Sequence, residues 1–209
     1  MNRYKIACLF LAFSLLAALV WLVVLTNSKT EVTNNEQAVI ENILSRKSVR
    51  IYTDQKVPRE KLDTLVRLGM SAPTGMDVRP WQFLIADSDE ALQKLATAMP
   101  RAKQFETCKA AIVVMGDTAV LDRRGNPSTN WPFDCSAATE NILLGAEAMG
   151  LGACWVAVYP YEDRLPFVKE QLGLPANVIP LCVVTIGYPD GENQPKDKYN
   201  PDIIHYNGW

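Results

Sequence analysis

Apolar and polar positions divide the chain into a long apolar run, a short polar stretch and a longer region of mixed periodicity. Residues 6–25 read "IACLFLAFSLLAALVWLVVL" and carry no charge. A helix rises about 1.5 Å per residue, so this run can cross a hydrocarbon layer of roughly 30 Å. We therefore assign 1–28 to an N-terminal transmembrane anchor or signal peptide, 29–36 to a polar linker, and 37–209 to a folded domain.

Two interpretations of residues 1–28 remain open, an uncleaved anchor and a cleaved signal peptide. The apolar core of a signal peptide is usually only about 7–15 residues long, so the length of this run favours the anchor. Arg3 and Lys5 precede the run and are expected to stay on the cytoplasmic side of the membrane. The sequence thus predicts a membrane-anchored or exported chain, with its folded domain on the extracytoplasmic (periplasmic) side.

Beyond the linker, segments with helical periodicity alternate with short apolar runs. The predicted helices are 37–45, 58–72, 88–99, 134–149 and 163–172, and the predicted strands are 81–86, 110–117, 153–158 and 179–189. The run 110–117 is apolar throughout, which is typical of a strand covered on both faces. Helices interleaved with four strands indicate a layered α/β or α+β domain.

Composition limits the chemistry that this domain can perform with its own side chains. The net charge of −2 gives no basic field for a nucleic-acid partner. His205 is the only histidine, so a two-histidine metal site is excluded and a catalytic triad would have to recruit a tail residue. The five cysteines show no CxxC spacing, and Cys154 and Cys182 lie in apolar runs typical of the core. We expect no metal site and a bound cofactor as the source of the chemistry.

The first cluster of candidate binding residues is "SRKSVRIY", residues 45–52, at the end of a predicted helix. Alternate residues of an extended chain share a face, so Arg46, Ser48 and Arg50 are predicted to point the same way. Two guanidinium groups and a hydroxyl on one side suit an anionic ligand with several acceptor atoms. A solvated basic turn is the alternative interpretation.

Two further stretches carry candidate binding residues. "SAPTGMDVRPWQF", residues 71–83, forms a loop between a predicted helix and strand, where backbone amides can closely approach a ligand. "PKDKYNP" places Lys196 and Lys198 on one face of an extended tail. An ordinary turn and a solvent-facing lysine pair are the respective alternatives. "GLGACWVAVYP", residues 150–160, lacks the third glycine and the downstream acid of a dinucleotide fingerprint.

Taken in order, four blocks resemble the nitroreductase family of FMN-dependent oxidoreductases across residues 37–209. "SRKSVRIY" looks like the family's RxSxRxF opening, and "APTGMDVRPWQF" looks like its APSxxNxQPWxF loop. "DCSAATENILLGAEAMGLGACW" is similar to the central block DxSxAxxNxxLxAxxxGLGxxW. "IPLCVVTIGYP", followed by "PKDKY" and "IHYNGW", resembles the closing strand and basic tail.

The resemblance implies a nitroreductase-like α+β sandwich, with a mixed central sheet flanked by helices, in an obligate intertwined homodimer. Two FMN sites would lie at the subunit interface. The cofactor-binding residues that it implies are Arg46, Lys47, Ser48, Arg50, Pro73, Thr74, Gly75, Asp77, Val156, Ala157, Val158, Lys196 and Lys198. No catalytic side chain is implied, because the flavin ring itself carries the chemistry.

The implied residues have different roles. Residues 46–50 would contact the phosphate, the ribityl chain and pyrimidine O2, with Lys47 contributing at least its backbone. Residues 73–75 would approach the flavin from the other subunit, residues 156–158 would lie near flavin N5, and Lys196 and Lys198 would hold the phosphate. Arginine near N1 and O2 would stabilise the reduced anion.

Two positions depart from the family pattern. The loop asparagine of the family is Asp77 here, and the following glutamine is Arg79. A carboxylate at position 77 should repel an anionic flavin, although Asp77 could pair with Arg79 or with a ribityl hydroxyl. These departures bear on redox potential and substrate preference more than on cofactor binding.

The predicted function is a ping-pong oxidoreductase that passes two electrons from NAD(P)H through FMN to a nitroaromatic, a quinone or a similar electron-poor acceptor. Three alternatives remain open. The first is a membrane-tethered flavoenzyme that uses a non-nicotinamide donor, such as a quinone or a partner protein. The second acts on a specific small molecule, for example by reductive dehalogenation, and the third is a non-catalytic flavin-binding protein.

Overall fold

The computed structural model describes residues 13–22 and 35–209. Residues 13–22 and 35–45 are helical, and the chain divides into two compact units, Met1–Leu44 and Ser45–Trp209. No helix within these described ranges is long and apolar enough to cross a membrane. The predicted span 6–25 begins and ends at residues outside the described ranges. Most of the predicted linker 29–36 also lies outside them. Both therefore stay predictions.

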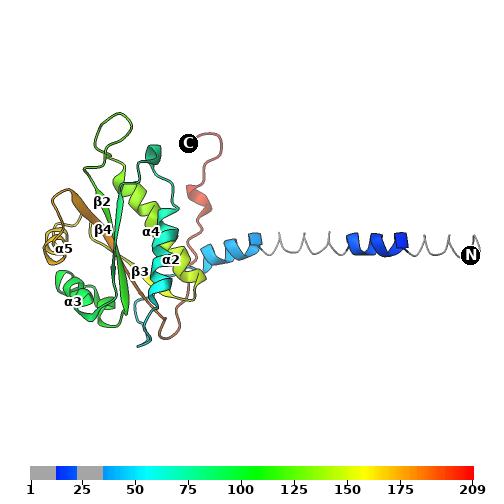
Figure 1. Cartoon of the computed structure of the whole chain (residues 1–209), viewed down its shortest axis with the longest axis horizontal. Helices are drawn as coiled ribbons and strands as arrows, with labels where there is room; N and C mark the ends of the chain where they lie inside the picture. The colour runs from blue at the N-terminus through cyan, green and yellow to red at the C-terminus, as the bar shows by residue number, and fades with distance from the viewer. Residues whose placement is uncertain (1–12, 23–34) are drawn as a thin grey trace, which may run out of the picture. The chain divides into compact units, whose positions relative to one another are not determined.

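The second unit is built on a four-stranded sheet (Figure 1). Its strands are β1 (Trp81–Ala86), β2 (Ala110–Asp117), β3 (Gly152–Ala157) and β4 (Val178–Gly187), in the spatial order β1-β2-β4-β3. The run 110–117 is buried along nearly its whole length, which confirms that β2 is covered on both faces. The α+β class is likewise confirmed.

The expected mixed sheet needs a correction, since all three strand pairings are antiparallel. Ala86 at the end of β1 pairs with Ala111 at the start of β2, so the connection through α3 (Asp89–Ala98) leaves and re-enters the sheet at one end. Strands joined in this way must run in opposite directions. Within the described residues, parallel pairing is confined to an isolated bridge between Ser48 and Ala153.

Helices cover both faces of the sheet and bury two hydrophobic clusters. Helices α2 (Arg59–Met70) and α4 (Trp131–Ala148) pack on one face (Figure 1). Helices α3 and α5 (Leu165–Leu172) pack on the other. Ser88 caps α3 by accepting the Ala91 N–H, as helix-start chemistry predicts. Short 3-10 turns occupy Gly75–Asp77, Lys103–Glu106 and Pro201–Ile203.

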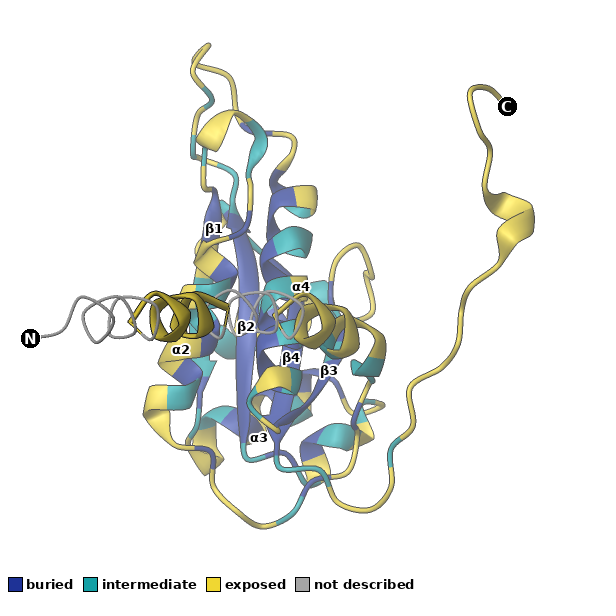
Figure 2. Ribbon diagram, turned by 90° about the vertical axis from the view of Figure 1, so that its right-hand side faces the viewer, coloured by how far each residue is buried: buried dark blue, intermediate teal, exposed yellow. Residues whose placement is uncertain are grey.

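The C-terminal tail leaves the body of the domain (Figure 2). Every residue of 194–209 is exposed, including the large apolar side chains of Tyr199, Tyr206 and Trp209. Helix 35–45 also exposes Val39 and Leu44 along its length. Exposed apolar side chains grouped in this way are typical of interaction surfaces.

Candidate functional site

A cavity of about 480 Å³ opens beside β3, an edge strand of the sheet. Its wall comes from residues 154–157 of β3, from residues 98–104 at the end of α3, and from the turn before α5. Apolar groups share this wall with four charged side chains, those of Arg50, Arg101, Asp163 and Arg164. Cavities of this size, with apolar walls and a few placed polar groups, are typical small-molecule sites.

The segment 45–52 runs beside the first half of β3 and leaves the second half open to the cavity. The Val49 N–H donates to Ala153 O over 3.0 Å, and the Val49 side chain is buried. The buried Tyr52 hydroxyl lies 2.6 Å from Val49 O and 2.9 Å from Thr185 Oγ1. Tyr52 therefore fixes this segment to the sheet.

Arg46 and Arg50 do not share a partner, because Arg46 pairs with α4 whereas Arg50 lines the cavity. Burial raises the pKa of the Cys154 thiol, and Arg50, Gln104, Ser48 and Arg46 each lower it in part, because all four lie near its sulfur. Ser48 and Arg50 are exposed on either side of the buried Val49. Of Arg46, Ser48 and Arg50, only Arg50 belongs to the cavity wall.

Two of the cations in this segment form ion pairs with α4. Arg46 Nε lies 3.3 Å from Glu140 Oε1, and Lys47 Nζ lies 2.7 Å from Glu147 Oε1. The two glutamates are seven residues apart, about two helical turns, and so lie on one face of α4. The Lys47 side chain also donates to Ser45 O, so its ammonium is held away from the cavity.

Of the predicted β3 residues, Val156 and Ala157 line the cavity and Val158 does not. Val158 is fully buried, and the N–H groups of Val158 and Tyr159 both donate to Leu181 O over 3.0 Å. Leu181 lies where the register between β2 and β4 shifts, so its carbonyl is available to this turn. A bulge in the neighbouring strand thus turns Val158 into the core.

Four polar cavity residues were not predicted from the sequence: Arg101, Gln104, Asp163 and Arg164. Arg164 Nη1 donates to Ala157 O over 2.8 Å, and Gln104 Nε2 lies 3.6 Å from Cys154 Sγ. Asp163 lies 3.9 Å from both Arg101 and Arg164, and partly offsets their charge. One sequence signal was available, because "PRAKQ" places cations directly after a predicted helix, as residues 45–50 do.

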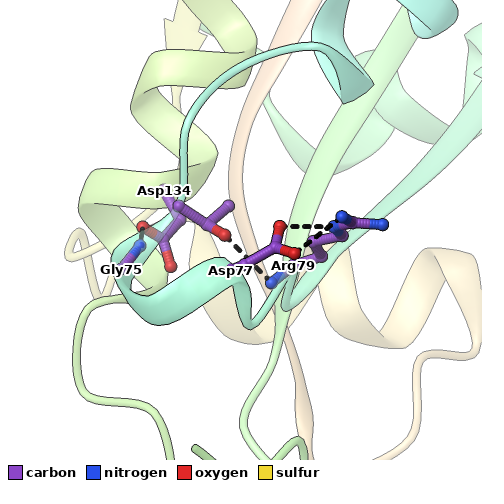
Figure 3. Close-up of polar contacts among 5 residues, drawn as sticks. Gly75, Asp77, Arg79 and Asp134 are labelled. Atoms are coloured by element: carbon purple, nitrogen blue, oxygen red, sulfur yellow. Dashed lines mark hydrogen bonds and ion pairs between the residues drawn. The ribbon is translucent and has the colours of Figure 1, made fainter.

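The predicted loop 71–80 lies at the other edge of the sheet, since it leads directly into β1. The Gly75 N–H donates to Asp134 Oδ1 over 2.9 Å, and the Arg79 N–H donates to Thr74 Oγ1 over 3.2 Å (Figure 3). Met76, Asp77 and Arg79 have φ angles of 54°, 58° and 53°, in the left-handed region that most residues avoid. The loop is therefore held in an unusual backbone conformation.

The two residues that depart from the family pattern pair with each other. Arg79 Nε and Nη2 donate to Asp77 Oδ1 and Oδ2, each over 2.7 Å (Figure 3). The Arg79 guanidinium holds the pKa of the Asp77 carboxyl below its ordinary value. Asp77 therefore pairs with Arg79, one of the two partners considered for it.

The predicted binding residues thus form three groups in one copy of the chain. Arg50, Val156 and Ala157 line the cavity, with Ser48 and Arg46 close by. The loop that contains Thr74 and Gly75 follows the opposite edge of the sheet. Lys196 and Lys198 lie on the exposed tail, outside the cavity wall.

Replacing Gly152 with alanine is expected to destabilise the domain by about 1–3 kcal/mol, because overpacking forces neighbouring atoms apart. A Cβ at Gly152 would lie 2.7 Å from both Val49 Cβ and Val49 Cγ1. Urea unfolding of the variant gives the change in free energy.

Gly208→Ala is the matched control, because a Cβ there meets open space and the backbone is not in the left-handed region. The double variant Val49→Ala, Gly152→Ala should lose less stability than the sum of the single variants, since the smaller side chain makes room. Strict additivity would contradict the close contact between Val49 and Gly152.

Comparison with known proteins places this geometry in context. The nitroreductase family model matches residues 43–106 and 100–188. A protein of Archaeoglobus fulgidus, provisionally named an NADH dehydrogenase/NAD(P)H nitroreductase, is 36% identical over 173 residues, covering 81% of this chain and 98% of the relative. The match to the family model includes the cavity and loop 71–80, and it ends at residue 188, before the tail lysines.

Solved structures agree over a similar length. A Bacteroides thetaiotaomicron protein with the same provisional name is 49% identical, with a TM-score of 0.76, and the match covers 82% of this chain and 98% of that one. An FMN-dependent nitroreductase of Clostridium difficile is 27% identical, with a TM-score of 0.74, and covers 81% and 99% of the two chains.

Proposed function

The chain belongs to the nitroreductase family, and from this premise we propose that it passes two electrons from NAD(P)H, through FMN, to a small electron-poor acceptor such as a nitroaromatic or a quinone. Family membership makes it an FMN-dependent NAD(P)H oxidoreductase. The observation that carries the proposal is the cavity where Arg50 faces the open half of β3. Donor and acceptor would use this site in turn.

The cavity residues fit FMN by their chemistry. A phosphorylated flavin needs cationic donors for its phosphate and carbonyl oxygens and an apolar surface for its ring. Arg50, Arg101 and Arg164 supply guanidinium groups, and Met99 and Val156 supply part of the apolar wall. FMN, when bound, supplies the hydride-accepting and hydride-donating chemistry.

The side chains of the protein bind, orient and tune this cofactor. Arg50 places a permanent positive charge at the site, which favours a flavin that carries negative charge after reduction. Ala157 O is held by Arg164, so the β3 edge keeps its position while a ligand binds. Apolar wall residues limit the access of water, which strengthens each of these charge interactions.

We infer that the complete site forms in an intertwined homodimer. One copy keeps its cavity residues and its loop 71–80 at opposite edges of the sheet, so only a second copy can unite the two groups. The exposed tail, with Lys196, Lys198 and several aromatic residues, has the length and composition to reach across a partner. Helix 35–45 offers a further apolar surface for the same purpose.

The purified chain is expected to be yellow, with one FMN per copy and a sedimentation mass of a dimer. Anaerobic NADH or NADPH should bleach the flavin absorbance, and a nitroaromatic or quinone should restore it. Bleaching by a quinol but not by either nicotinamide would favour the alternative donor. A colourless chain that FMN cannot reconstitute would refute the proposal.

A further inference from the structure

The loop 74–79 keeps its position through contacts that do not involve the charged side chains of Asp77 and Arg79. The Gly75 N–H is bound by Asp134, a buried residue in the first turn of α4. At the other end of the loop, the Arg79 N–H is bound by Thr74 Oγ1. Both anchors use backbone N–H groups of the loop, so they persist when the side chain of residue 77 or 79 is changed.

Asp77 and Arg79 form a bidentate ion pair, called the fork below, on the outside of this anchored loop (Figure 3). Their side chains are 57% and 65% exposed, so the fork lies on the surface of the loop and is available to a molecule that binds there. Both oxygens of the carboxylate are engaged by one guanidinium group. The two charges cancel, and the remaining cation near Asp77 is Arg123, which acts at longer range.

We propose that the Asp77–Arg79 pair is a specificity-determining element that keeps the loop electrically neutral where it approaches the acceptor, so that the loop adds no preference of its own for the charge of the acceptor. This inference rests on the proposed function, in which the loop of one copy lies beside the flavin of the other. Removing one member of the pair exposes the charge of the other. Asp77 alone repels anionic acceptors, whereas Arg79 alone attracts them.

The test compares two acceptors of similar shape and different charge, 4-nitrobenzoate and 4-nitrobenzamide. Arg79→Gln should lower the ratio of their kcat/KM values, benzoate over benzamide, by about three- to fivefold, and Asp77→Asn should raise it by a similar factor. The double variant Asp77→Asn, Arg79→Gln removes both charges and should return the ratio to within about twofold of the wild-type value.

A second readout does not depend on turnover. Because FMN carries a phosphate charge, Arg79→Gln should weaken FMN binding and Asp77→Asn should strengthen it, each by a few-fold. Quenching of flavin fluorescence gives both dissociation constants. Both effects should shrink at about 0.5 M salt, since the fork is exposed and exposed charges are screened.

Arg59→Gln is the matched control, because Arg59 forms a comparable ion pair with Asp87 at the far end of α2. It removes the same charge from the protein as Arg79→Gln, and the acceptor ratio should not change. A shift of equal size in this variant would mean that overall charge, not the loop, sets the preference.

The outcomes separate this inference from the proposed function. If the wild-type protein binds FMN and reduces both acceptors, but the ratio is the same in all variants, the inference is overturned and the function stands. Equal losses for both acceptors in both single variants would also overturn it, because they indicate a purely structural pair. If the wild-type protein binds no FMN, the proposed function fails, and the inference with it.

Discussion

Replacing Arg50 with glutamine is expected to raise the dissociation constant of FMN by about 10- to 100-fold. Arg50 lines the cavity directly and belongs to the segment that Tyr52 fixes to the sheet. Its only hydrogen bond within the described residues runs to Ser48 O over 3.2 Å, which leaves most of its fork for a ligand. Hydrogen bonds to charged groups contribute about 1.5–3 kcal/mol, which corresponds to the stated range.

Titration of the apoprotein with FMN, followed by flavin fluorescence, measures this effect. Arg50→Lys keeps the charge and loses the planar fork, so its dissociation constant should lie between those of the wild type and the glutamine variant. Arg67→Gln, on the exposed side of α2, is the control and should bind FMN normally. An unchanged dissociation constant in Arg50→Gln would remove Arg50 from the site.

Stability toward urea is expected to fall steeply as the pH rises above about 9. Burial raises the pKa values of the Cys108, Cys135 and Cys182 thiols to about 12. In the unfolded chain these thiols ionise near pH 8.5–9, so above that pH the unfolded state binds fewer protons than the folded state. The free energy of unfolding should therefore drop by about 2 kcal/mol for each thiol between about pH 8 and pH 10.5.

Urea unfolding in the presence of a reductant, at both pH values, measures the drop. Cys182→Ala supplies the control, because it removes one buried thiol from the core. Its stability at about pH 8 will be lower than that of the wild type, but its loss between the two pH values should be smaller by about 2 kcal/mol. An identical loss in the two proteins would show that Cys182 does not contribute to the alkaline transition.

Local periodicity was sufficient to place the helices and strands. The run 110–117 has no polar residue before its end, and it became the buried strand β2. Ser88 precedes a helical pattern and caps α3. These features depend on neighbouring residues, and for that reason the sequence predicts them without knowledge of the fold.

The start of helix α4 could not be predicted from neighbouring residues alone. Its start was predicted at Asp134, but the helix begins at Trp131 and Asn130 holds the cap position. Asp134 lies in the first turn and accepts the N–H of Gly75, which is 59 residues away in the chain. A side chain with a distant partner is not available as a local cap, and the sequence pattern around it does not reveal that partner.

The residues of the candidate site divide in the same way, into those that the sequence identified and those that only the structure revealed. The resemblance to the family identified Arg50, Val156 and Ala157, and the spacing of charges allowed the pairing of Asp77 with Arg79. The sequence did not identify Arg101, Gln104 or Arg164, because these residues reach the cavity only after α3 and α5 pack on the sheet. The structure also shows that Lys47 pairs with α4 and that Val158 faces the core.

The sequence by itself determined the approximate helices and strands and the cationic segment 45–50, because these depend on residues close together in the chain, and it indicated the family through four ordered blocks. Tertiary structure decided the direction of the strands, the wall of the cavity and the separation of the binding residues into groups at opposite sheet edges. These features depend on contacts between distant segments, and side-chain burial and backbone hydrogen bonding fix such contacts only when the whole chain folds.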